Sequence, residues 1–199
     1  HFLYDGGNNI IRAKDEYTDI SMEYSGMGRM ISRSQSGTRI QFEYDREEQL
    51  TAVINEFGRV YQFEHNARGE IISESGFDGL LRQFIKDPAG RTVRINRPSQ
   101  RHSLYTYDAN NRIHKIVHSD GSSKTYEYRP DGQLINASND SLAIKWELDP
   151  LGRLTKEHQG NFWIASEYNA LGDRLRIKSS LGLDQQIERN QRGNVLKVP

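Results

Sequence analysis

The sequence predicts an all-β protein, in which tandem β-hairpin repeats of 20–21 residues form one long curled antiparallel strip. Three observations lead to this prediction. A decapeptide occurs in ten copies at nearly constant spacing, aromatic residues alternate with glutamate in most copies, and turn-forming residues follow at fixed positions. We take these elements in order along one repeat.

The recurring decapeptide defines a register for the whole chain. In each copy we call one residue the anchor. It is followed by Asp, Asn or Ser in nine of the ten copies, and successive anchors are 20 or 21 residues apart. We number positions relative to the anchor i and expect residues 1–199 to be a single array of about ten repeats, incomplete at both ends. The anchors are Tyr4, Tyr24, Tyr44, His65, Lys86, Tyr107, Tyr128, Leu148, Tyr168 and Arg189.

The residues up to the anchor predict a strand with one buried face. Position i is tyrosine in six copies, position i−2 is aromatic in seven, and the position between them is glutamate in seven, which is the period of two expected for a half-buried strand. The aromatic residues at i−2 are Phe2, Phe42, Phe63, Phe84, Tyr105, Tyr126 and Trp146. The glutamates at i−1 are Glu23, Glu43, Glu64, Glu127, Glu147, Glu167 and Glu188.

The residues after the anchor predict a tight turn. Asp or Asn at i+1 starts a turn by accepting bonds from the amides ahead of it, and proline at i+2 suits its middle. Position i+4 should adopt a positive φ, because it is Gly or Asn in every copy except one, which has Glu48. The prolines are Pro88, Pro130 and Pro150, and the asparagines at i+4 are Asn8 and Asn111.

A second strand should follow each turn, because i+7 and i+9 are mostly apolar, and a second glycine at i−7 marks the turn into the next repeat. A loop from i+1 to i+4 would pair i−2 with i+7, placing Phe63 opposite Ile72, Phe84 opposite Val93 and Tyr126 opposite Ile135. The apolar residues also include Ile95, Ile116, Leu175, Ile177, Leu196 and Val198. The glycines at i−7 are Gly37, Gly58, Gly79, Gly121 and Gly182.

Composition limits the classes of function. The chain has 27 basic and 27 acidic side chains, so no net charge draws it to nucleic acid or to an anionic membrane. It has no cysteine, no apolar run long enough to span a membrane and no secretion signal at its N-terminus. With 35% hydrophobic residues we expect a thin core, and the aromatic face should be covered by more of the same strip or by an enclosed polypeptide.

The repeats resemble those of the YD-repeat, or Rhs (rearrangement hotspot), family, whose motif reads roughly Tyr-Asp-x-x-Gly-x-Leu. The motif appears here as YDGGNNI, YDREEQL, YDANNRI, YRPDGQL, LDPLGRL and YNALGDR, and the resemblance covers essentially the whole chain. Departures from the motif are His65, Lys86, Leu148 and Arg189 in place of tyrosine, and Glu48 in place of glycine.

The resemblance implies a hollow β-shell that, in bacterial members, encloses a C-terminal toxin domain. It implies a secreted or cell-surface location and a role in virulence or interbacterial competition. The implied partners are the enclosed toxin, the remaining shell repeats, and type VI spike or toxin-complex proteins, with no nucleic acid and no membrane span. Family members of the toxin type carry aspartates for self-cleavage in a later core segment, which we do not find in this chain.

No residue is assigned a catalytic, cofactor-binding or metal-binding role, and we expect no enzyme activity and no cofactor. Asp87-Pro88 and Asp149-Pro150 look most like acid sites, yet they occupy the turn position that Asp5, Asp45 and Asp108 share. His114 and His118 have the i, i+4 spacing of helical zinc ligands but lie on a predicted strand, where they would be roughly 13 Å apart.

Two further patterns have an alternative functional reading. SGMGRM at 25–30 resembles a phosphate-binding loop but stands at a repeat turn, with no helix predicted after it. The arginines at i+5, Arg29, Arg91, Arg112 and Arg153, could form a basic stripe, but acidic neighbours favour salt bridges. The alternative function is a repeat module that binds carbohydrate or a cell surface, as in adhesion proteins related to the teneurins.

Overall fold

The computed structural model describes residues 1–190 and 193–197. These residues form strands joined by turns, and none of them is helical, so the predicted all-β class of antiparallel hairpin repeats is confirmed. The chain divides into two compact units, His1–His102 and Ser103–Pro199. Within the described ranges there is no helix that could cross a membrane.

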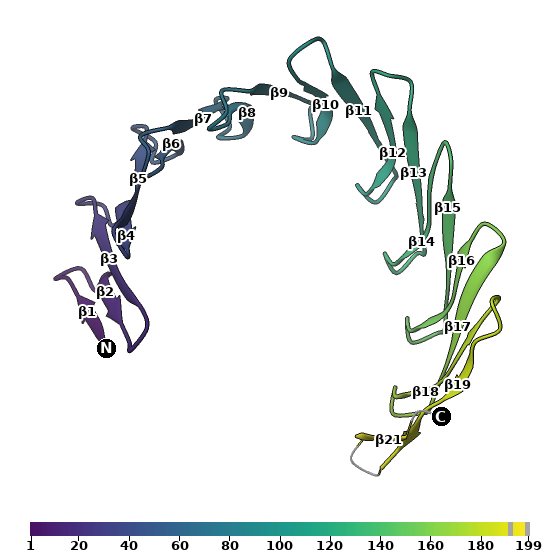
Figure 1. The fold of residues 1–199 in the computed structure, drawn as a ribbon. Helices are drawn as coiled ribbons and strands as arrows, with labels where there is room; N and C mark the ends of the chain where they lie inside the picture. Colours follow the sequence, from purple (N-terminus) through teal and green to yellow (C-terminus); the bar gives the residue numbers. More distant parts are fainter. Residues whose placement is uncertain (191–192, 198–199) are drawn as a thin grey trace. The chain divides into compact units, whose positions relative to one another are not determined.

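The first unit is a meander in which each strand pairs antiparallel with the next strand in the sequence (Figure 1). Two strands and their anchor turn make up one repeat. The strands are β1 (Phe2–Tyr4), β2 (Ile10–Lys14), β3 (Asp19–Tyr24), β4 (Met30–Gln35), β5 (Thr38–Tyr44), β6 (Leu50–Ile54), β7 (Val60–His65), β8 (Ile71–Ser75), β9 (Leu81–Lys86) and β10 (Thr92–Asn96).

The second unit repeats this arrangement from β11 to β19 and adds a short pair, β20 and β21. Its strands are β11 (His102–Tyr107), β12 (Ile113–His118), β13 (Ser123–Tyr128), β14 (Leu134–Asn139), β15 (Ala143–Leu148), β16 (Leu154–Gln159), β17 (Phe162–Tyr168), β18 (Arg174–Ser179), β19 (Asp184–Gln186), β20 (Glu188–Arg189) and β21 (Val195–Lys197).

The two faces of the sheet differ as the alternation predicts. All seven glutamates at i−1 are exposed, whereas the aromatic side chains at i and i−2 are half-buried from β3 onward. Ala52 is the one hydrophobic side chain among the described residues that is buried, and the buried polar ones are Ser32, Ser73 and Ser103. The predicted thin core is confirmed, because so few side chains of the described residues are buried.

The predicted strand register is wrong by two residues. Position i−2 pairs with i+9, so that Phe63 lies opposite Glu74, Phe84 opposite Ile95 and Tyr126 opposite Ala137. Two features shift the register. The loop closes between i+1 and i+5, and the register breaks between i−1 and i, where i+7 becomes the extra residue of a β-bulge.

The predicted turn positions are confirmed. Every residue at i+4 has a positive φ, and so do all five glycines at i−7. Glu48, the departure from the Gly/Asn pattern, adopts the same conformation at φ 62°. Of the residues predicted to belong to second strands, Val198 lies outside the described residues.

Candidate functional site

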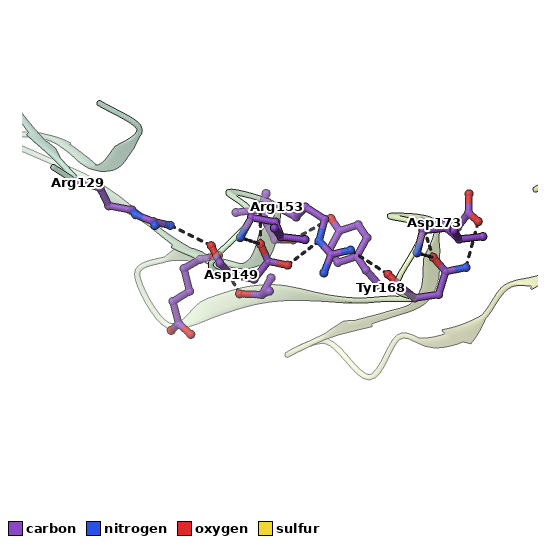
Figure 2. Close-up of polar contacts among 11 residues, drawn as sticks. Arg129, Asp149, Arg153, Tyr168 and Asp173 are labelled. Carbon is purple, nitrogen blue, oxygen red and sulfur yellow. Dashed lines mark hydrogen bonds and ion pairs between the residues drawn. The ribbon is translucent and has the colours of Figure 1, made fainter. Parts of the chain in front are cut away.

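The anchor turn, positions i+1 to i+5, holds the most polar contacts of each repeat, and Asp149 shows how it is built (Figure 2). The Asp149 N–H donates to the carbonyl of Arg153 (3.0 Å), and the Gly152 N–H donates to the carbonyl of Asp149 (3.0 Å). The N–H groups of Leu151 and Arg153 both donate to Asp149 Oδ1 at 2.9 Å. The aspartate thus satisfies the amides of a five-residue loop.

Arg153 connects this turn to the next one (Figure 2). Its Nε donates to Asp149 Oδ2 (2.5 Å), and its Nη1 donates to the carbonyl of Asn169, which is position i+1 of the following repeat (2.9 Å). The guanidinium also lies over the ring of Tyr168, with Cζ 5.2 Å from the centroid. The arginine therefore binds its own aspartate and stacks on the next anchor.

Arg112 makes the same three kinds of contact two repeats earlier. It binds Asp108 Oδ2 (2.7 Å), donates to the carbonyl of Arg129 (2.9 Å) and lies 4.6 Å from the ring centroid of Tyr128. Arg129 in turn donates to the carbonyl of Asp149 (3.0 Å), which continues the row of turns.

The anchor tyrosine has a specific partner that alternation alone does not reveal. Its hydroxyl donates to the backbone carbonyl at i+6 of the preceding repeat. The four bonds, at 2.8–3.0 Å, run from Tyr24 to Ile10, from Tyr44 to Met30, from Tyr128 to Ile113 and from Tyr168 to Leu154. Arg189, an anchor that replaces tyrosine, donates to the equivalent carbonyl of Arg174 at 3.2 Å.

We use the word joint for the contact of position i+5 of one repeat with the anchor and the anchor turn of the next repeat. Where i+5 is not arginine, its side chain lies against the glycine at i+4 of the next turn. A Cβ added at Gly28 would lie 3.7 Å from Asn9 Oδ1, one at Gly69 3.3 Å from Gln49 Oε1, and one at Gly193 3.5 Å from Asp173 Oδ1. At Gly90 and Gly152 it would clash with the side chains of Glu70 and Gln133.

Where i+5 is arginine, this space stays open. A Cβ at Gly132 or Gly172, the glycines that follow Arg112 and Arg153, would meet nothing within 4 Å. Glu48 follows Arg29 and binds it, with 2.9 Å between Arg29 Nη2 and Glu48 Oε2. The glycine at i+4 therefore serves both a positive φ and, at joints without arginine, the close approach of a neighbouring side chain.

The electrostatics of the two Asp-Pro dipeptides oppose a role as proton donors. Partial burial alone would raise the pKa of Asp149, but the bonds from the N–H and guanidinium of Arg153 outweigh it and hold the pKa below its usual range. The pKa of Asp87 is lowered by the same balance with Arg91. A general acid needs a raised pKa, so both carboxyl groups are turn acceptors.

The structure places the other candidates apart from one another. His114 Nδ1 contacts the carbonyl of Tyr126 (3.1 Å), whereas His118 Nδ1 contacts Ser103 Oγ (2.8 Å). Among the residues with described positions, no three His, Asp or Glu side chains are placed to share a metal ion. SGMGRM is an anchor turn between β3 and β4, closed by a bond from the Ser25 N–H to the carbonyl of Arg29 (2.8 Å).

The arginine row forms the ion pairs predicted for it. Arg91, Arg112 and Arg153 pair with the aspartate at i+1 of their own turn, and Arg29 pairs with Glu48 of the next turn. In the repeats of Arg29 and Arg153 the residue at i−1 is Glu23 or Glu147, and these glutamates contact Arg39 and His158 instead. The sequence signal for the joints is the pairing of i+5 with the next anchor, 15 or 16 residues later.

Comparison with known proteins supports the fold. No family model matches the chain. The chain is 24% identical over 145 residues to the double-stranded DNA deaminase toxin A of Burkholderia cenocepacia, a match that covers 69% of this chain and 10% of that protein. The chain therefore spans about a tenth of the length of this relative.

Solved structures of TcdB2-TccC3 share the fold over nearly the whole chain. The form without the hypervariable C-terminal region matches with a TM-score of 0.79 and 14% identity, over 96% of this chain and 13% of that one. Another TcdB2-TccC3 structure matches with a TM-score of 0.77 and 13% identity, over 99% and 12%. The hairpin meander and these matches show that the chain shares the fold of the TcdB2-TccC3 structures, and its repeat motif resembles that of the YD-repeat (Rhs) family.

Proposed function

We propose that this chain is a length of wall in the β-shell of a secreted bacterial YD-repeat toxin, and that it helps to enclose the toxin domain until delivery. The observation that carries the proposal is a one-layer strip of hairpins with an aromatic face that is only half-buried within the chain. Exposed apolar side chains extend this face, including Phe162 at 58% and Ile164 at 52% exposure. An exposed apolar face of this kind is typical of a surface that another polypeptide covers.

The likeness to the deaminase toxin and to TcdB2-TccC3 supports this role, since the chain matches a small part of two much longer proteins, one of which is a toxin. In the proposal the chain itself supplies no catalytic group and no cofactor site. Its partners are the enclosed toxin domain, other repeats of the same shell, and proteins of the toxin complex or the secretion apparatus. The protein would act outside the cell that makes it.

Cysteine labelling can test which face lines a lumen. The chain has no cysteine, so single substitutions in it introduce the chain's only thiol. In the full-length protein, with its other cysteines replaced, Ile164→Cys on the aromatic face should be protected from a bulky maleimide. Lys145→Cys on the glutamate face, which carries Glu147, should react. Unfolding should make both react.

Equal reactivity of the two positions in the folded full-length protein would exclude an enclosed aromatic face. Imaging by electron cryo-microscopy gives an independent check, since a strip without a lumen would also exclude the shell. Specific binding to a glycan array, lost in Trp146→Ala without unfolding, would instead favour the carbohydrate-binding alternative.

A further inference from the structure

The joints of the two units are not equivalent. Eight joints lie within the units. In six of them the residue at i+5, the next anchor or both are a tyrosine or a Lys, Arg, Asp or Glu. The remaining two are Gln49 with His65 and Gln133 with Leu148. They connect β6 to β7 in the first unit and β14 to β15 in the second.

Among the described residues, three of the four buried polar atoms without a partner belong to these two joints. Over the described residues, four buried side-chain atoms have no hydrogen-bond partner: Gln49 Oε1, His65 Nδ1, Gln133 Oε1 and Asn136 Oδ1. Gln49 and His65 form the first joint, Gln133 belongs to the second, and Asn136 lies on β14 opposite Lys145 of β15. A buried polar atom without a partner destabilises the closed state relative to a state in which water reaches it.

The surface is also hollowed at the first of these joints. A depression of about 690 Å³ lies there, and Asp45, Gln49, Phe63 and His65 are among the residues that line it. At a tyrosine anchor the ring spans the distance to the preceding repeat, as in the bond from Tyr44 to Met30 (2.9 Å). The imidazole of His65 is shorter than a phenol, and Leu148 has no group that could donate to the preceding carbonyl.

We propose that the strip opens first at these two joints, between β6 and β7 and between β14 and β15. Hairpins on either side of each joint would separate as intact blocks, because stability in a repeat array is a sum over nearest-neighbour interfaces and the weakest interface opens most often. Each unit then contains one built-in breakpoint. This inference concerns the chain itself and does not rest on the proposed shell function.

Hydrogen exchange measured by mass spectrometry on the full-length protein tests the proposal directly. Peptides that cover β6–β7 and β14–β15 should exchange on the order of tenfold faster than those that cover β4–β5 and β16–β17. The comparison is matched, because the faster and slower peptides are strand pairs of the same repeat architecture in the same unit. Equal exchange at all four joints would overturn the proposal.

A designed pair of substitutions tests the cause. The double variant Q49R/H65Y installs the Arg–Tyr joint, with Asp45 at i+1 to accept the new guanidinium and Gly69 at i+4 to leave it room. Exchange in β6–β7 should slow to the level of β4–β5, while β14–β15 should stay fast. Unchanged exchange in β6–β7 of this folded variant would contradict the proposal.

The opposite pair of substitutions supplies the control. R153Q/Y168L converts a strong joint into the Gln–Leu type and should raise exchange in β16–β17 by about tenfold. If this variant does not fold, the map of the unmodified protein and the Q49R/H65Y variant still decide the question. If the proposed shell function is wrong, the hydrogen-exchange pattern expected here is unchanged. The two proposals can therefore be tested independently.

Discussion

At the scale of the residue, position i+4 shows how the side chain that fits at one position depends on a neighbour in the preceding repeat. A positive φ is unfavourable for most L-residues, and the chain mostly uses glycine there. Glu48 adopts φ 62° nevertheless, and its ion pair with Arg29 offsets part of the strain. Whether a side chain fits at i+4 therefore depends on residue i+5 of the preceding repeat.

Two glycine substitutions test this dependence. Asparagine tolerates a positive φ, as Asn8 and Asn111 show at 64° and 61°. We expect Gly152→Asn to lower the free energy of unfolding by about 1 kcal/mol more than Gly172→Asn does, because it forces Gln133 into a poorer rotamer. Urea denaturation of the two variants measures the difference.

The variant Gln133→Ala provides the control for this comparison. In its background the Gly152→Asn substitution should cost no more than Gly172→Asn, since the clash is gone. Equal costs for the two substitutions in the unmodified chain would show that the joint does not restrict position i+4.

At the scale of the element, four of the hairpin turns are closed by an aspartate whose pKa is lowered. Asp5, Asp87, Asp108 and Asp149 all have lowered pKa values and accept backbone N–H bonds within their turns. For Asp108 the bond from the Arg112 N–H is the largest cause. Folding therefore favours the ionised carboxylate in these four turns, and each of them contributes to stability.

This arrangement predicts acid sensitivity. A carboxyl group with a lowered folded pKa contributes stability above its unfolded pKa, near 3.9, and loses it as the pH falls through the folded value. We expect the melting temperature to be steady from about pH 7 to 5 and to fall below about pH 4. Thermal melts followed by circular dichroism across this range measure the effect.

The variant Asp149→Asn separates the contribution of the ionised carboxylate from that of the turn hydrogen bonds. Asn66 and Asn169 accept the same amide bonds, so asparagine keeps the turn but removes the titrating group and the ion pair with Arg153. The variant should be less stable at pH 7 and should approach the unmodified protein as the pH falls. A stability difference that does not change with pH would contradict the assigned role of Asp149.

At the scale of the whole molecule, strands pair only with their neighbours in sequence within each unit. Stability should therefore be nearly additive over repeats, with no central core that every hairpin needs. The small buried set, with Ala52 as its hydrophobic member among the described residues, agrees with this additivity.

Removing a whole repeat should consequently be tolerated. Deletion of residues 149–168 brings Asn169 directly after Leu148 and preserves both the strand direction and the joint with Gln133. We expect a folded β-protein whose denaturant m-value is lower by about a tenth, in proportion to the surface lost. Circular dichroism and urea titration measure both quantities.

Deletion of residues 149–158 is the matched control. It removes half a repeat, so a strand of the wrong direction and face would follow Leu148, and folding should fail. A loss of folding on removal of the whole repeat would show that the array depends on contacts beyond nearest neighbours.

Local rules made much of the fold predictable from the sequence. The period of 20–21 residues, the alternation around Glu147 and the turn at Gly152 follow from side-chain chemistry within a few residues. The interpretation of Asp149 as a turn residue likewise followed from its shared slot. The predicted pairing of Phe63 with Ile72 is wrong because a bulge depends on how two strands twist together, which no local pattern reports.

The sequence by itself determined the repeat, its two turns and the face that each aromatic side chain takes, since these depend on backbone preferences and on the period of a strand. Only the tertiary structure decided the register and the joints. The bond from Tyr168 to Leu154 and the stacking of Arg153 on Tyr168 connect residues about 15 apart, which become neighbours after the hairpins align. That alignment also shows Gln49–His65 and Gln133–Leu148 as the joints with unsatisfied polar atoms.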